Sequence, residues 1–145
     1  MERQHFSIRI NAPRERVWRV LWDDATYSQW TAPFGAGGRA VSDWKEGSRV
    51  HFLSAEGDGM FSVIERREEN AFMGFKHLGM LKGGEEQPAD DAIREWAGAK
   101  EEYTLKQNND GTDLSVAMDV GDSEVPAFKE MFPKALAIVK KLAEQ

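Results

Sequence analysis

Residues 126–142 read PAFKEMFPKALAIVKKL, and the spacing of their apolar side chains predicts one long amphipathic helix. Lys134, Ala137 and Lys141 fall on the opposite side of that helix. Because so apolar a face must be covered, we expect the rest of the chain to form a sheet that wraps the helix. The apolar residues recur at steps of three and four: Phe128, Met131, Phe132, Ala135, Leu136, Val139 and Leu142.

Pro133 stands inside this predicted helix. A proline there removes a hydrogen bond and presses on the preceding turn, at a cost of about 3 kcal/mol. We therefore expect either a bend at Pro133 or a preliminary turn followed by a helix that begins there. Asp122 or Ser123 is the expected N-terminal cap, because a short polar side chain can accept a hydrogen bond from the first turn.

The composition is typical of one globular domain over residues 1–145. A formal net charge of −6 argues against a nucleic-acid partner and an anionic membrane, since both require clustered lysine and arginine. Without cysteine, the chain has no disulfide, thiolate metal site or cysteine nucleophile. No apolar run approaches the roughly 20 residues of a membrane span. The start, MERQHF, does not resemble a secretory signal, so we expect a cytoplasmic protein.

The first part of the chain predicts a strand and two short helices. Residues 5–10 alternate between polar and apolar side chains, as a half-buried strand does. Pro13 suits the first turn of a helix, and the apolar stripe after it includes Trp18 and Trp22. Residues 23–30 predict a second short helix.

From residue 39 onward, short strand-like runs alternate with turns. Connections this short favour antiparallel neighbours, so the runs predict a meander. Residues 81–98 interrupt it, and we interpret them as a solvated insertion held by Trp96, with a mobile flap as the alternative. The predicted strands cover residues 39–44, 49–55, 60–67, 71–81, 100–107 and 112–120.

This order of elements predicts an α+β protein with a helix-grip fold, in which a curved antiparallel sheet wraps a long C-terminal α-helix. The two short helices after the first strand would close one end. Such an arrangement leaves room for a cavity between the sheet and the C-terminal helix.

Several motifs occur in the order and spacing of a known family. They resemble the START-like, or SRPBCC, superfamily and within it the AHSA group, homologues of the activator of heat-shock-protein ATPase. The resemblance extends from about residue 8 to residue 142, and the family usually has Trp where Phe132 stands. The motifs are APRERVW at 12–18, YSQW at 27–30, DWKEGS at 43–48, FKHLG at 75–79, YTL at 103–105 and FPKAL at 132–136.

The resemblance implies a deep hydrophobic pocket, used across the superfamily to carry lipids, sterols or other apolar molecules. Our leading hypothesis is therefore non-enzymatic binding of a small hydrophobic or amphipathic molecule, without a cofactor. One alternative is a protein-interaction module that regulates a heat-shock-protein ATPase, as in the eukaryotic co-chaperone. The 145 residues leave no room for the additional domain of that co-chaperone. Another alternative is a cyclase or hydrolase, because a minority of members are enzymes with polar groups in the pocket.

Three polar residues carry the enzyme alternative. His77 shares a predicted strand face with Phe75, and Tyr103 shares one with Glu101. A histidine beside a carboxylate can act as a general base. We favour the simpler interpretation of a satisfied strand histidine and a glutamate at a wet strand end, since a slip of one residue in register turns every side chain over.

Other kinds of site find little support. His5, His51 and His77 lie on separate predicted strands without a short ligand spacing, so we expect no metal site. No GxSxG nucleophile motif occurs. The candidate pocket-lining residues are Trp30, Phe34, Trp44, Phe52, Phe75, His77, Glu101, Tyr103, Met118, Phe128 and Phe132.

Overall fold

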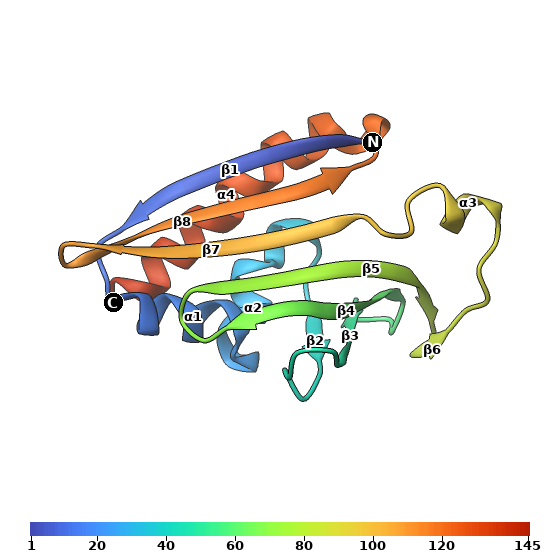
Figure 1. Cartoon of the computed structure of the whole chain (residues 1–145), viewed down its shortest axis with the longest axis horizontal. Helices are drawn as coiled ribbons and strands as arrows, with labels where there is room; N and C mark the ends of the chain where they lie inside the picture. Colours follow the sequence, from blue (N-terminus) through green and yellow to red (C-terminus); the bar gives the residue numbers. More distant parts are fainter.

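The computed structural model describes residues 1–145 and shows a curved antiparallel sheet wrapped around a long C-terminal helix (Figure 1). The predicted helix-grip fold class is thereby confirmed. The helices are α1 (Arg14–Trp22), α2 (Asp24–Trp30), α3 (Asp91–Arg94) and α4 (Val125–Ala143), with 3₁₀ turns at Ala32–Phe34 and Asp122–Glu124. The strands are β1 (Glu2–Ile10), β2 (Arg39–Val41), β3 (Arg49–Leu53), β4 (Gly59–Glu68), β5 (Phe72–Lys82), β6 (Glu85–Glu86), β7 (Lys100–Asn108) and β8 (Gly111–Val120).

The sheet has the strand order β1-β8-β7-β5-β4-β3-β2, and β6 pairs with the end of β5. Every pairing is antiparallel. The chain therefore runs as a meander from β2 to β8, as predicted, and the first strand joins at the far edge beside β8. None of the helices has the length and apolar character needed to cross a membrane.

Helix α4 buries the predicted apolar face against β1, α1 and α2. Ala135 and Val139 are fully buried, and Phe132 and Leu136 are nearly so. The helix continues through Pro133, which is exposed, so the alternative of a helix that begins at Pro133 is wrong. Because Pro133 lies on the solvent side, the buried stripe of α4 stays continuous.

The predicted cap of α4 is also wrong. The cap position is Glu124, whose side chain makes no capping hydrogen bond. Asp122 instead lies in a 3₁₀ turn, 3.2 Å from the amino group of Met1. The turn before α4 is thus tied to the start of β1.

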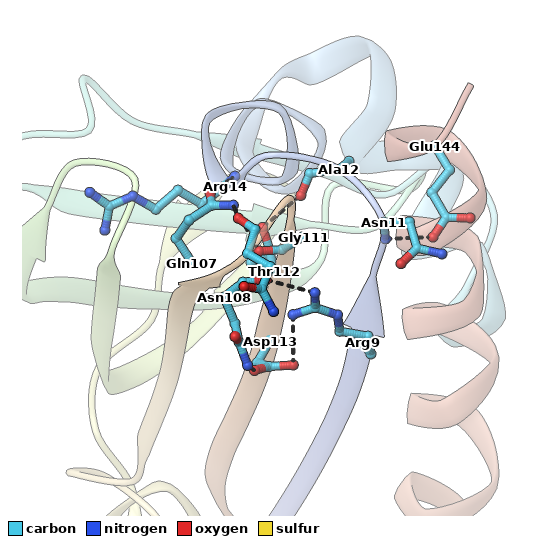
Figure 2. Close-up of polar contacts among 11 residues, drawn as sticks. Arg9, Asn11, Ala12, Arg14, Gln107, Asn108, Gly111, Thr112, Asp113 and Glu144 are labelled. Atoms are coloured by element: carbon cyan, nitrogen blue, oxygen red, sulfur yellow. Dashed lines mark hydrogen bonds and ion pairs between the residues drawn. The ribbon is translucent and has the colours of Figure 1, made fainter.

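At the end of the sheet that carries the β7–β8 turn, hydrogen bonds tie the strands to the helices (Figure 2). The buried Thr112 hydroxyl donates to the Ala12 carbonyl at 2.8 Å. The Asn11 N–H donates to the Glu144 carboxylate at 2.7 Å. A hydrogen bond from Lys140, and then the one from Asn11, hold the pKa of Glu144 below its usual range. These contacts close the fold at this end.

Candidate functional site

A cavity of about 650 Å³ lies between the concave face of the sheet, helices α1 and α2, and the N-terminal half of α4. This volume is within the range of small-molecule sites, about 300–1,000 Å³. Exposed lining residues include Met1, Phe34 and Met80, which mark the mouth. The lining includes Met1 and Trp96, and Figure 1 shows that the N-terminus and α3 lie at the end of the sheet opposite the β7–β8 turn.

Nine of the residues proposed from the sequence lie in the cavity lining. They come from α2, the turn after it, four strands and α4, so the fold brings together positions that are up to 102 residues apart, from Trp30 to Phe132. The nine are Trp30, Phe34, Phe52, His77, Glu101, Tyr103, Met118, Phe128 and Phe132.

Trp44 and Phe75, which we also expected in the lining, lie elsewhere. Phe75 is fully buried in the core, with its ring centroid 5.2 Å from that of Phe52 and 5.4 Å from that of Trp22. Strand β2 ends at Val41, three residues before Trp44, which takes a left-handed conformation with φ of 63°. That turn directs the Trp44 ring onto Trp22, at 5.6 Å, and outside the cavity.

Trp22 and Tyr27 line the cavity although the sequence analysis assigned them only to the short helices. The Trp22 ring meets the Tyr103 ring edge-on at 5.0 Å, and Tyr27 meets Trp30 in the same way at 5.4 Å. Edge-to-face pairs of this kind add about 0.5–1.5 kcal/mol each beyond the burial of their area. The inner part of the cavity therefore has a rigid aromatic wall.

A chain of hydrogen bonds runs along this wall. The Ser62 hydroxyl lies 2.6 Å from His77 Nδ1, and His77 Nε2 lies 3.3 Å from Glu101 Oε1. The Tyr103 hydroxyl donates to the other oxygen of Glu101. With a neutral imidazole, Ser62 donates to Nδ1 and Nε2–H donates to Glu101. The Glu101 carboxylate thus accepts two hydrogen bonds at the cavity surface.

A β-bulge explains why Ser62 meets His77. The pairing of β4 with β5 shifts between Phe61, which faces Gly79, and Ser62, which faces His77. A bulge of this kind re-aims a side chain and bends the sheet. In the sequence, the only signal is that Ser62 and Ile64 are two positions apart in a predicted strand and so share one face. The structure buries both completely.

The backbone of His77 also fixes its position. Its N–H donates to the Ala99 carbonyl, and its own carbonyl accepts from the Gly98 N–H, both at 2.8 Å. These bonds attach the end of the 81–98 insertion to β5. Within that insertion, α3 is a single turn capped by Asp90, and the half-buried Trp96 reaches the cavity lining.

The two phenols on the wall are held in the protonated form. Burial, and then the charge of Glu101, raise the pKa of Tyr103 well above its ordinary value. The same two causes, in the same order, raise the pKa of Tyr27. Both hydroxyls therefore remain hydrogen-bond donors at neutral pH.

His77 and Glu101 lie together on the cavity wall, which is the arrangement that acid–base chemistry requires. Ser62 cannot serve as a nucleophile, because it is fully buried and does not reach the lining. It acts instead by holding the imidazole ring. No three histidine, aspartate or glutamate side chains gather into a metal-like cluster.

The chain matches the family model described as activator of Hsp90 ATPase homologue 1-like protein over residues 11–142. Among curated proteins, none matches this sequence. The solved Aha1 dimer from Colwellia psychrerythraea is 16% identical with a TM-score of 0.73, and the match covers 99% of this chain and 97% of that one.

Two further solved structures are similar. Protein CV1439 from Chromobacterium violaceum is 17% identical with a TM-score of 0.71, over 100% of this chain and 99% of that one. CalU16 from Micromonospora echinospora is 16% identical with a TM-score of 0.69, over 97% and 75%. At such identities the structures demonstrate a shared fold, whereas the family model spans nearly the whole sequence. The resemblance seen in the sequence motifs is confirmed, and this chain belongs to the family of activator of Hsp90 ATPase homologue 1-like proteins.

Proposed function

We propose that this protein binds a small hydrophobic or amphipathic molecule in the cavity between the sheet and α4. The observation that carries the proposal is a hollow of about 650 Å³ with an aromatic wall and one compact polar group, His77 with Glu101 and Tyr103. Ligand sites have this composition: apolar side chains supply contact area, and a few polar groups set orientation.

The distribution of exposed apolar side chains supports the same function. Only four large hydrophobic residues are exposed, namely Met1, Phe34, Val41 and Met80. Three of these line the cavity, and Val41 alone does not. An apolar molecule at the mouth would cover those three and remove their surface from water, which is worth about 25 cal/mol per Å².

The proposal is tested by native mass spectrometry of gently purified protein and by titration with N-phenyl-1-naphthylamine, a neutral dye that fluoresces in apolar sites. We expect a bound molecule or a saturable site for the dye. Phe128→Ala removes a half-buried ring from the lining and should weaken dye binding about tenfold, equivalent to about 1.4 kcal/mol.

Met131→Ala is the matched control for this variant. Met131 is half-buried on the same helix but does not line the cavity, so its truncation should leave dye affinity unchanged. Protein that carries no molecule and shows no saturable dye binding would refute the proposal. Equal losses in the two variants would place the dye outside the cavity.

A second candidate function is acid–base catalysis on a molecule held in the same cavity. It is favoured by the His77–Glu101 pair, whose nitrogen and oxygen lie 3.3 Å apart in the lining. The test is to follow the mass of a copurified molecule during incubation. Turnover that is lost in His77→Gln would support catalysis, and an unchanged molecule would support binding alone.

A third candidate is regulation of a chaperone ATPase, supported by the family description and by the Colwellia relative that is named Aha1. The test is to measure the ATPase rate of purified Hsp90 with and without this protein. No stimulation and no binding at micromolar concentration would count against it.

A further inference from the structure

The charge of the cavity wall carries an inference about the class of ligand, and this inference rests on the proposed binding function. We infer that the ligand is an apolar ammonium, whose cationic nitrogen lies against Glu101 among the aromatic rings of α1, α2 and β7. An apolar body would extend from there toward Phe128 and the mouth.

Glu101 lies in the cavity lining with hydrogen-bonding capacity to spare. Its side chain is only 15% exposed, and the only basic group within ion-pair distance is His77, which is charged only when protonated. No lysine or arginine comes within ion-pair distance of this carboxylate. A carboxylate accepts at about four lone-pair sites, and His77 and Tyr103 use one on each oxygen. Each oxygen therefore retains capacity for a donor supplied from the cavity.

Four aromatic rings form one contiguous cluster that includes Tyr103, the hydrogen-bond donor to Glu101. Tyr27 and Trp30 lie 5.4 Å apart between ring centroids, Trp30 and Tyr103 lie 6.3 Å apart, and Trp22 and Tyr103 lie 5.0 Å apart. All four line the cavity. Aromatic faces attract cations, with a contribution that rises from about 0.5 kcal/mol at exposed sites to about 2 kcal/mol when desolvated. A cluster of rings that shares the cavity with a carboxylate suits an ammonium better than it suits an anion.

Across the whole lining, carboxylates outnumber the cationic side chains, so the head group of a fatty acid would meet charge of its own sign. The Met1 amino group, also in the lining, is paired with Asp122 at 3.2 Å. Apart from that amino group and His77, the charged lining residues are Arg39, Asp58, Glu101, Glu124 and Asp119, and the Asp119 carboxylate is paired with Arg3 at 3.2 Å.

The experiment compares three ligands that share one alkyl chain and differ in the charge of the head: decylammonium, decan-1-ol and decanoate. Affinities are measured by displacement of the neutral naphthylamine dye, below the concentrations at which these compounds form micelles. We expect the ammonium to bind at least tenfold more tightly than decanoate, with the alcohol between them.

Glu101→Gln should reduce this preference to less than about threefold, because the charge that distinguishes the ammonium from decanoate is removed. Glu102→Gln removes the same charge from the neighbouring residue on the other face of β7, outside the cavity, and should leave the preference intact. If circular dichroism shows that Glu101→Gln does not fold, the test uses Tyr27→Leu instead. This variant removes one aromatic ring and should weaken binding of the ammonium but not of the alcohol or decanoate.

The possible failures are distinguishable. If none of the three compounds displaces the dye and the dye itself does not bind, the proposed function fails. If the alcohol binds and decanoate equals or exceeds the ammonium, the binding function stands and the ammonium inference is overturned. A preference that persists in Glu101→Gln, or that disappears equally in Glu102→Gln, also overturns it.

Discussion

Replacement of Tyr103 by phenylalanine tests the polar group of the cavity wall through protein stability. Tyr103 is 1% exposed, and its hydroxyl donates to the Glu101 carboxylate. Hydrogen bonds to charged groups contribute about 1.5–3 kcal/mol, because the partner left behind is desolvated without a donor. We therefore expect Tyr103→Phe to lower the free energy of unfolding by about 1.5–3 kcal/mol at neutral pH.

Tyr27→Phe is the matched control, since it removes the same hydroxyl from the same cavity wall. The Tyr27 hydroxyl makes no hydrogen bond within the protein and is not among its buried unsatisfied atoms. This variant should change the free energy of unfolding by no more than about 0.5 kcal/mol. Urea denaturation followed by tryptophan fluorescence measures both changes.

A double-mutant cycle isolates the interaction itself. With Glu101→Gln as the second substitution, Tyr103→Phe should show a coupling energy of about 0.5–3 kcal/mol, because the two side chains are in direct contact. The reasoning is refuted if Tyr103→Phe costs no more than the Tyr27 control, or if the two substitutions at Tyr103 and Glu101 are additive.

The remaining predictions concern the tyrosine ionisation, the closed end of the sheet and the proline of α4. Burial and the Glu101 charge raise the pKa of both tyrosines, so ultraviolet absorbance of the folded protein should show little tyrosinate at about pH 11, above the ordinary tyrosine pKa of about 10. The unfolded chain releases those protons at lower pH than the folded protein does. The free energy of unfolding should therefore fall above about pH 10, by up to about 1.4 kcal/mol per pH unit for each tyrosine. Titration of both tyrosines near pH 10 in the intact fold would contradict this. Thr112→Val removes a fully buried hydroxyl that donates to a carbonyl, and it should lower the free energy of unfolding, measured by urea denaturation, by about 1–3 kcal/mol. Thr104→Val, at an exposed position of β7, should lower it by less than about 0.5 kcal/mol. Pro133→Ala restores a donor within α4 and should raise the melting temperature, with a gain of up to about 3 kcal/mol; a lower melting temperature would mean that the proline is required for the path of the helix.

The fold could be predicted from the sequence because the patterns that indicate its elements are local. The steps of three and four from Phe132 to Val139 predict the buried face of α4, and alternation in residues 5–10 predicts the first strand. The connections between strands are short, and short connections join antiparallel neighbours. Two local predictions were wrong: the cap position of α4 is Glu124 and not Asp122 or Ser123, and Trp44 takes a left-handed conformation that strand alternation does not indicate.

The candidate site could be predicted from the sequence only in part. Alternation on β5 and β7 places His77, Glu101 and Tyr103 on inner faces, and all three reach the cavity. Phe75 follows the same alternation but is covered by Phe52, which no periodic pattern could indicate. A periodicity reports which face a side chain is on and not what lies above it.

The tertiary structure alone decided which polar groups meet. Ser62, His77 and Glu101 form a hydrogen-bonded chain because the register of β4 shifts against β5 by one residue at Leu78 and because Gly98 and Ala99 hold β5 against the start of β7. Strand register depends on long-range pairing, and a shift of one residue turns a side chain to the other face. Local sequence therefore predicted the sheet and the helix that it grips, whereas long-range register determined the acidic, aromatic wall of the cavity between them.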